Sequence, residues 1–175
     1  MTIIREEQRD DHAIVKDIVE AAFATMQHSS GTEHLIVERL RRSNAFIPEL
    51  SLVAEREGQI IGHLLLSKVQ VKSKDKEHTT LSLAPVSVLP SDQRQGVGSL
   101  LIRRGHERAL ELGYSAIVLI GHSAYYPRFG YEPAVNFGIH FPYDSPSENC
   151  MAVELEKGAL HHVSGEVVYP REFFE

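Results

Sequence analysis

Two glycines stand at the start of a helix-like segment, in the run Gln93-Arg94-Gln95-Gly96-Val97-Gly98-Ser99. The first amides of a helix have no acceptor inside the helix, and the positive end of its dipole attracts anions. Glycine also lets the backbone approach a ligand closely. The run therefore predicts a phosphate site made of backbone amides, although it would also fit a turn that only joins a strand to a helix.

Two common nucleotide-binding motifs share these features, and the run matches neither. A dinucleotide fingerprint needs a third glycine, but Leu101 stands three positions beyond Gly98. A P-loop needs Gly-Lys-Ser or Gly-Lys-Thr, and the sequence holds neither triplet. Both motifs are excluded.

The residues before the glycines, 81–90, form an extended and mostly apolar segment with Pro85 inside it. Proline cannot donate to a sheet ladder, so it marks a bulge or a sheet edge. A bulge there would free backbone groups of the strand for hydrogen bonds to a ligand.

The chain has 175 residues, of which 42% are hydrophobic and 24% charged, so it can bury a core. This length fits one domain, which we place at residues 1–175. Cys150 is the single cysteine, which excludes an intrachain disulfide framework and a cysteine-based zinc site. We expect it to be a buried thiol in a protein of a reducing compartment.

The 18 basic and 24 acidic residues give a formal net charge of −6, which argues against non-specific binding of nucleic acid. A local basic pocket at Arg94, Arg103 and Arg104 would suit a small phosphorylated ligand better than a polymer. Residues 1–7 include acidic side chains where a secretory signal would be apolar, and no run approaches the roughly 20 apolar residues that span a bilayer. We expect a cytoplasmic protein without a membrane or nucleic-acid partner.

Hydrophobic periodicity supplies the elements that position these groups. Asp10 or Asp11 can cap a helix with apolar positions from Ile14 to Met26, and further helices are predicted at about 35–43 and 96–112. Strands are predicted at 3–4, 52–56, 60–66, 80–89, 116–120, 135–141, 150–155 and 166–169.

The order of these elements predicts an α/β (α+β) fold, with a mixed sheet and helices on both faces. The turn Glu57-Gly58-Gln59 closes a hairpin, and the mixed charges of residues 72–78 indicate a solvated hairpin tip. A strand, a helix and a strand between residues 80 and 120 imply a right-handed crossover and two parallel central strands.

With these elements in place, the chain resembles the GNAT superfamily of acetyl-CoA-dependent N-acetyltransferases. The phosphate signature of that family, Q/R-x-x-G-x-G/A after a central strand, is matched in full by residues 93–98. Residues 53–62 look like the family's second-to-third-strand hairpin, and residues 125–131 look like its short helix and Phe-Gly-aromatic turn. The matches cover most of residues 1–141, whereas 142–175 match less distinctively. The resemblance implies a GNAT-type, mostly antiparallel sheet whose two central parallel strands splay apart.

The resemblance also implies that acetyl-CoA is the co-substrate and that no metal is needed to bind it. Backbone amides would hold its pyrophosphate along Arg94, Gln95, Gly96, Val97, Gly98 and Ser99. Its pantetheine arm would pair with the backbone of Val86, Ser87 and Val88.

Acetyl transfer from a thioester to an amine needs a neutral amine, a stabilised oxyanion and a proton for the departing thiolate. By resemblance, Tyr126, four residues before Gly130, is the general acid, and the Val88 amide is the oxyanion donor. A tyrosine with a pKa of about 10 stays protonated at rest. The other interpretation is that Tyr125 and Tyr126 are packing aromatics, a role that we assign to Tyr125.

The general base is less clearly marked. Many relatives carry a glutamate in the strand after the phosphate helix, but residues 116–120 read Ala-Ile-Val-Leu-Ile. This leaves His122, Glu55, His63 or a water chain to bulk solvent. We list His122 with Tyr126 as catalytic, because it follows the strand end and histidine titrates in the useful range.

The sequence thus predicts an acyltransferase that moves acetyl from acetyl-CoA to a primary amine of a small molecule or protein, by direct attack in a ternary complex. The alternatives are a catalytically weak coenzyme A-binding sensor or interaction module, and a mononucleotide-binding domain. The acceptor amine, the use of other acyl groups and the oligomeric state are left open, including a homodimer. Residues 27–32 and 142–149 are the segments expected to shape the acceptor site.

Overall fold

The computed structural model describes residues 1–26 and 29–175. The described chain forms two compact units. The first unit comprises Met1–Ser67, Ala84–Arg108 and Arg171–Glu175, and the second comprises Lys68–Leu83 and Ala109–Pro170. Two long strands, β3 (Gln59–Lys72) and β4 (Glu77–Val88), each run through both units. The single domain expected at residues 1–175 stays a prediction.

Antiparallel strands form the sheet of the first unit. β1 (Thr2–Glu6) pairs with β2 (Ser51–Arg56), and β2 pairs with β3. β4 is the next neighbour of β3. Glu57 (φ +52°) and Gly58 (φ +79°) both lie in the left-handed region, which the tight turn between β2 and β3 requires. The predicted hairpin is confirmed.

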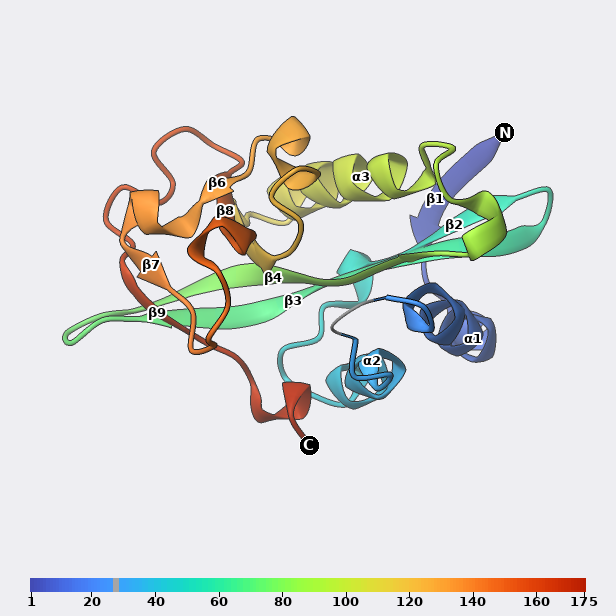
Figure 1. Ribbon diagram of the computed structural model, residues 1–175, viewed down its shortest axis with the longest axis horizontal. Coiled ribbons are helices and arrows are strands. Elements are labelled where there is room, and N and C mark those ends of the chain that lie inside the picture. The colour runs from blue at the N-terminus through green and yellow to red at the C-terminus, as the bar shows by residue number, and fades with distance from the viewer. Residues whose placement is uncertain (27–28) are drawn as a thin grey trace. The chain divides into compact units, whose positions relative to one another are not determined.

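Helices cover both faces of this sheet, as predicted (Figure 1). α1 (His12–Phe23) and α2 (Glu33–Arg41) lie on one face, where they pack with Val53 and Leu65. α3 (Val97–Glu111) begins in this unit and lies on the other face. Because successive strand residues point to opposite faces, Gly62 faces α3 whereas Leu65 faces α1 and α2.

The contact between α3 and β3 is close because two glycines face it. A Cβ at Gly62 would lie 3.1 Å from Leu101 Cδ1, and one at Gly105 would lie 3.2 Å from Leu64 Cδ2. A glycine inside a helix costs about 1 kcal/mol relative to alanine. Gly105 is therefore explained by close packing of the helix on the sheet, as the sequence suggested.

In the second unit, β5 (Ala116–Ile120) pairs along its whole length with the antiparallel β8 (Cys150–Glu154). The short β6 (Glu132–Pro133) adds to β8, and β9 (Gly165–Val168) pairs with β3. Mixed topology comes from β4 and β5, which pair in parallel at Leu81 with Ile117 and at Ser82 with Val118. The predicted mostly antiparallel sheet with parallel central strands is confirmed.

A separate apolar core holds the second unit together. Its buried residues come from β3, β5, the two-residue β7 (Ile139–His140), β8, β9 and the connecting turns: Val69, Val71, Ala116, Val118, Ala134, Ile139, Ala152, Leu160, Val163 and Val167. Cys150 is buried at the start of β8, and its burial raises the pKa of the thiol. The predicted buried thiol is confirmed.

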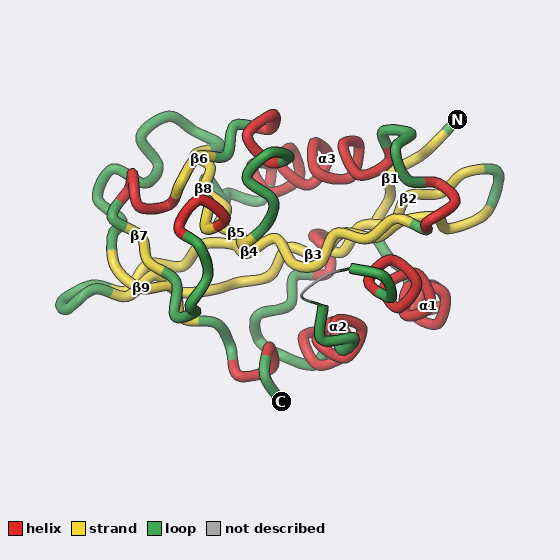
Figure 2. The backbone as a smooth tube through the Cα atoms, viewed as in Figure 1, coloured by secondary structure: helices red, strands yellow, loops and turns green. Residues whose placement is uncertain are grey.

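The strand predicted at residues 135–141 is wrong. Ala134–Phe137 form a 3₁₀ turn instead, and only Ile139–His140 are extended, as the two-residue β7 (Figure 2). Gly138 ends the turn with φ +72°, and its amide bonds to the carbonyl oxygen of Val135 at 3.0 Å. Apolar and polar residues alternate over 135–141 as they would in a strand, but the segment forms a turn that ends at Gly138 in the left-handed conformation.

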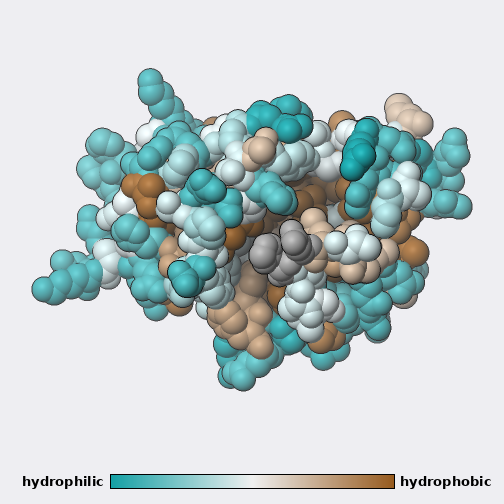
Figure 3. Space-filling view, viewed as in Figure 1, coloured by the Kyte–Doolittle hydropathy of each residue, from teal (hydrophilic) through white to brown (hydrophobic). Residues whose placement is uncertain are grey.

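The charged stretch between β3 and β4 is a solvated hairpin tip, as predicted. Residues 72–79 are exposed, and Figure 3 shows the tip as a hydrophilic projection. Lys72 and Glu77 form an ion pair across it at 3.6 Å. Among the described residues, no helix is both long and apolar enough to cross a membrane.

Candidate active site

The segment between β4 and α3 has the backbone shape of an anion-binding loop. Arg94 (φ +64°) and Gly96 (φ +84°) both take the left-handed conformation. α3 begins directly afterwards at Val97, which is 1% exposed and anchors the helix start in the core. Gly96 is exposed, and a Cβ there would meet no atom within 4 Å. The helix start is thus open on the side of Gly96.

Side chains of the same segment hold the loop in shape. Gln93 Nε2 donates to the Val88 carbonyl oxygen at 3.0 Å, and Gln95 Nε2 donates to the Ser91 carbonyl oxygen at 3.2 Å. A guanidinium nitrogen of Arg56 donates to Gln95 Oε1 at 2.9 Å. The two glutamines of the signature therefore stabilise the loop. The backbone amides of the first turn of α3 have no acceptor inside the helix and could donate to an anion.

β4 presents a hydrogen-bonding edge next to this loop. The Leu89 amide donates to the Ile61 carbonyl oxygen at 2.9 Å, toward β3. Amides alternate in direction along a strand, so those of Val88 and Val86 point away from β3. On its other side, β4 pairs with β5 only as far as Ser82. This edge of Val86 and Val88 can therefore pair with an extended ligand.

Tyr126 lies in the second unit, in a 3₁₀ turn (Tyr126–Phe129) that follows β5. A Cβ at Gly121 would overlap the Tyr126 ring, because it would come within 2.9 Å of Cδ2. The ring also makes edge contacts with Tyr125 and Tyr131, at centroid distances of 5.1 and 5.8 Å. Burial, and to a smaller extent Tyr125, raises the pKa of Tyr126 above its ordinary value. Its hydroxyl is therefore protonated at neutral pH.

Tyr125 has a structural role in the same turn. Its ring packs against Phe129 at a centroid distance of 5.3 Å, and the Arg128 guanidinium lies 4.6 Å from its centroid. Arg128 Nε donates to the Tyr125 carbonyl oxygen at 2.9 Å. These contacts agree with the packing role predicted for Tyr125.

The three side chains considered for the general base have different surroundings. His122 is exposed, and its carbonyl oxygen accepts the Tyr125 amide at 3.1 Å. Glu55 is paired with Arg5, with 2.7 Å between Oε2 and Nε. His63 is fully buried on the face of β3 that α1 and α2 cover, and its Nε2 lies 3.0 Å from Ser51 Oγ. His122 is thus exposed, the Glu55 side chain is 29% exposed but held by Arg5, and His63 is closed to solvent.

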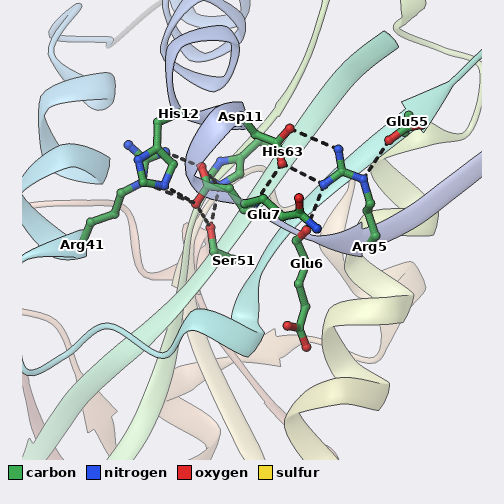
Figure 4. Close-up of polar contacts among 10 residues, drawn as sticks. Arg5, Glu6, Glu7, Asp11, His12, Arg41, Ser51, Glu55 and His63 are labelled. Atoms are coloured by element: carbon green, nitrogen blue, oxygen red, sulfur yellow. Dashed lines mark hydrogen bonds and ion pairs between the residues drawn. The ribbon is translucent and has the colours of Figure 1, made fainter. Parts of the chain in front are cut away.

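His63 belongs to a buried polar cluster that sequence reasoning missed (Figure 4). Ser51 Oγ donates to Glu7 Oε2 at 2.7 Å, and Arg41 forms an ion pair with Glu7. The Glu7 side chain is 2% exposed. Burial alone would raise the pKa of Glu7, but His63, Arg41 and Ser51 together hold it below its ordinary value. Glu7 is thus a buried carboxylate in its charged form.

The predicted site residues fall into two groups. The predicted cofactor-binding residues, 86–88 and 94–99, lie in the first unit, where the bond between Gln93 and Val88 joins them. His122 and Tyr126 lie in the second unit, in one turn. Among the described residues, no group of three or more metal-ligating side chains could hold a metal ion.

The two segments expected to shape the acceptor site are described unequally. Gln27 and His28 of the first segment lie outside the described residues, while Ser29 Oγ donates to Glu33 at 2.6 Å. The second segment, residues 142–149, is a loop that ends in a 3₁₀ turn (Ser147–Asn149). Within it, the Tyr143 ring lies 5.6 Å from that of Tyr169.

Sequence comparisons relate the chain to acetyltransferases. A family model described as an acetyltransferase (GNAT) domain matches residues 3–134. Two proteins of Escherichia coli K12, named as the uncharacterized N-acetyltransferases YjhQ and YhbS, are each 32% identical to the chain. The match to YjhQ covers 81% of this chain and 76% of YjhQ, and the match to YhbS covers 82% and 84%.

Solved structures show the same fold. The GNAT family N-acetyltransferase YhbS from Escherichia coli, in complex with CoA, matches with a TM-score of 0.83 and 28% identity over 99% of this chain and 92% of that one. A GNAT family acetyltransferase from Brucella melitensis, in complex with acetyl-CoA, matches with a TM-score of 0.81 and 32% identity over 99% and 98%.

Proposed function

The chain belongs to the GNAT family of acetyltransferases, and on that premise we propose that it transfers an acetyl group from acetyl-CoA to a primary amine. The acceptor is a small molecule or a protein, and the amine attacks directly in a ternary complex. The observation that carries the proposal is the loop in which Arg94 and Gly96 turn left-handed just before α3. The related YhbS and Brucella structures hold CoA and acetyl-CoA, respectively.

Acetyl-CoA supplies the activated acetyl group, and the first unit is proposed to bind it. The residues fit such a ligand, because the backbone from Arg94 to Ser99 offers several amides at a helix start and Gly96 leaves the approach open. Backbone donors suit a pyrophosphate without a metal ion. Val86 and Val88 would pair with the amides of the pantetheine arm, because their own amides point away from β3.

Two groups are proposed to stabilise the transition state. The Val88 amide donates to the carbonyl oxygen as negative charge develops on it, since a donor on a strand edge needs no reorganisation. Tyr126 donates its proton to the departing sulfur. Its raised pKa keeps the hydroxyl protonated, which is the form that a general acid needs.

His122 is kept as the solvent-exposed candidate for the general base, on its position in the turn before Tyr126. An exposed imidazole can return its proton to bulk water. The strand β5 carries no carboxylate, so the base must come from elsewhere.

The proposal is tested by binding and by turnover. Calorimetric titration with coenzyme A, with ATP as the control ligand, should show binding of coenzyme A alone. A panel of amines is then assayed with acetyl-CoA for thiol release, with longer acyl thioesters in parallel. Release that depends on one class of amine supports the proposal. Binding of coenzyme A without transfer to any amine would instead support the sensor function.

A further inference from the structure

His63 ends a buried chain of hydrogen bonds in the first unit (Figure 4). Its Nε2 lies 3.0 Å from Ser51 Oγ, which lies 2.7 Å from Glu7 Oε2. The three residues come from β3, from the start of β2 and from the residue after β1. No part of the His63 side chain is exposed.

This chain of contacts determines which ring nitrogen carries the proton. A carboxylate only accepts hydrogen bonds, so the single hydroxyl proton of Ser51 goes to Glu7. Ser51 Oγ must then accept from His63, which places the ring proton on Nε2. A neutral imidazole has one N–H, so Nδ1 of His63 carries a lone pair.

That lone pair has no partner among the described residues, and neither does the buried hydroxyl of Ser87. The hydrogen bond from the Leu89 amide to the Ile61 carbonyl oxygen pairs these two residues across the antiparallel strands. Two residues further along the pair, Ser87 of β4 therefore lies across from His63 of β3, and their side chains point to the same face of the sheet. Buried polar atoms are nearly always hydrogen-bonded. Two unpartnered buried polar side chains at facing strand positions therefore indicate a position for a third polar group, such as a bridging water.

Ser87 lies between Val86 and Val88, on the strand proposed to hold the pantetheine arm. Resting on the proposed acetyl transfer, we propose that His63, rather than His122, takes up the proton that the acceptor amine loses. The proton reaches Nδ1 through a water that bridges to the Ser87 hydroxyl. Ser51 and Glu7 are positioning residues that hold the ring in the Nε2–H form.

The proton transfer balances. The amine nitrogen forms a bond to the acetyl carbon, and the C–S bond breaks with its electron pair on sulfur. The proton leaving nitrogen passes through the water to His63 Nδ1, and Tyr126 gives its proton to sulfur. His63 later releases its proton to solvent, and Tyr126 takes one back.

The charges around His63 suit a transient proton acceptor. Burial lowers the pKa of His63 to about 4; Glu7 opposes this, and Arg41 from α2 and His12 from α1 add to it. The ring is therefore neutral at neutral pH, with its lone pair available. Such a weak base suffices because the amine nitrogen becomes acidic as it bonds to the acetyl carbon.

The first test compares His63→Gln and Ser51→Ala with His12→Gln. His12 is a matched control, since its Nε2 lies 4.0 Å from the same Glu7 carboxylate but its side chain is 42% exposed. With a saturating amine, His63→Gln should lose about 100-fold in kcat and Ser51→Ala about tenfold, because general base catalysis is typically worth 10²- to 10⁴-fold. Both should keep the wild-type affinity for coenzyme A, and His12→Gln should keep the wild-type rate.

A second measurement separates a proton acceptor from a packing residue. In His63→Ala, added azoles of similar size should restore turnover in proportion to their basicity, whereas a packing role would follow their size. Nitrogen-15 NMR of the histidines in the wild-type chain reads the tautomer directly and does not depend on any variant folding. It should show His63 protonated at Nε2.

Three outcomes would overturn the inference while the proposed function stands. The first is wild-type turnover in a folded His63→Gln. The second is turnover of His63→Ala that added azoles restore without dependence on their basicity, and the third is a His63 ring proton found on Nδ1. A wild-type chain that acetylates no amine in the panel would contradict the proposed function itself, and the inference with it.

Discussion

Gln93 is tied to Val88 by a hydrogen bond of 3.0 Å from its side-chain amide to the Val88 carbonyl oxygen. The bond joins the first residue of the phosphate signature to the last residue of β4. The strand edge proposed to hold the pantetheine arm and the loop proposed to hold the pyrophosphate are therefore fixed to each other. The glutamine acts on the ligand through the backbone that it holds in place.

Replacing Gln93 should consequently weaken binding of coenzyme A. Gln93→Ala removes one intramolecular hydrogen bond with a net value of about 1 kcal/mol, so the loss in affinity by calorimetry should reach at most about fivefold, when binding has to restore the loop. Gln70 is the control, since its Oε1 only accepts from the exposed Thr79 hydroxyl in the second unit. Equal affinity in Gln93→Ala and Gln70→Ala would show that the loop keeps its shape without this bond.

A side chain at Gly96 should block the loop. Gly96→Val strains a residue with φ +84° and places a branched side chain where the pyrophosphate is proposed to lie, at a cost of at least about tenfold in affinity for coenzyme A. Gly158→Val is the matched control, because Gly158 has φ +86° and the same open space in another turn. Both variants should lose similar stability in urea. If folded Gly96→Val binds normally, the phosphate loop is wrongly assigned.

The edge of β4 should depend on its backbone more than on its side chains. Val88→Pro deletes an amide that points away from β3, so it removes a donor to the ligand and no bond of the sheet. Ser87→Ala keeps every backbone donor. Titration with coenzyme A should show a larger loss for Val88→Pro, and equal tolerance of the two changes would count against pairing with pantetheine.

The hydroxyl of Tyr126 should matter to turnover and not to binding. Tyr126→Phe keeps the edge contacts of the ring with Tyr125 and Tyr131, and it removes the proton donor. A loss on the order of 100-fold in kcat is expected when chemistry limits the rate. Tyr125→Phe should be mild. Wild-type turnover in Tyr126→Phe would remove the tyrosine from the mechanism, and equal losses of binding and turnover would make it a packing residue.

The buried histidine should make the fold sensitive to acid. His63 has a pKa of about 4 when folded against an ordinary 6.5, so the unfolded chain binds more protons between these values. The free energy of unfolding should fall as the pH drops from about 7 to 4, by on the order of 3 kcal/mol from His63. Urea unfolding at several pH values should show a smaller fall for His63→Gln. The same fall in both chains would contradict the depressed pKa.

Local patterns predicted most of the fold because strand and helix periods act over a few residues. Gly58 marked the β2–β3 turn, and the apolar run Ala116–Ile120 is a strand over the predicted residues. The same reasoning failed at residues 135–141, where alternation could not distinguish a strand from a turn closed by Gly138. Such short segments depend on the tertiary contacts of Ala134 and Ile139, which lie in the core.

The cluster around Glu7 could not be predicted in the same way. Its members come from distant positions, and acidic residues are rarely buried unless they are paired. The available signal was His63 itself, a polar residue between the buried Ile61 and Leu65 in an apolar strand. Which partner a buried histidine meets depends on strand register and helix packing. The roles of the predicted site residues stay predictions.

The most direct measurement of the proposed activity follows both products of one reaction. The wild-type chain is incubated with acetyl-CoA and the best amine of the panel. The released thiol is measured with a colorimetric thiol reagent, and the acetylated amine is measured by mass spectrometry. Acetyl transfer predicts one acetylated amine for each thiol released, with both lowered together in Gly96→Val and Tyr126→Phe. Tight binding of coenzyme A with no acetylated amine from any acceptor would contradict it.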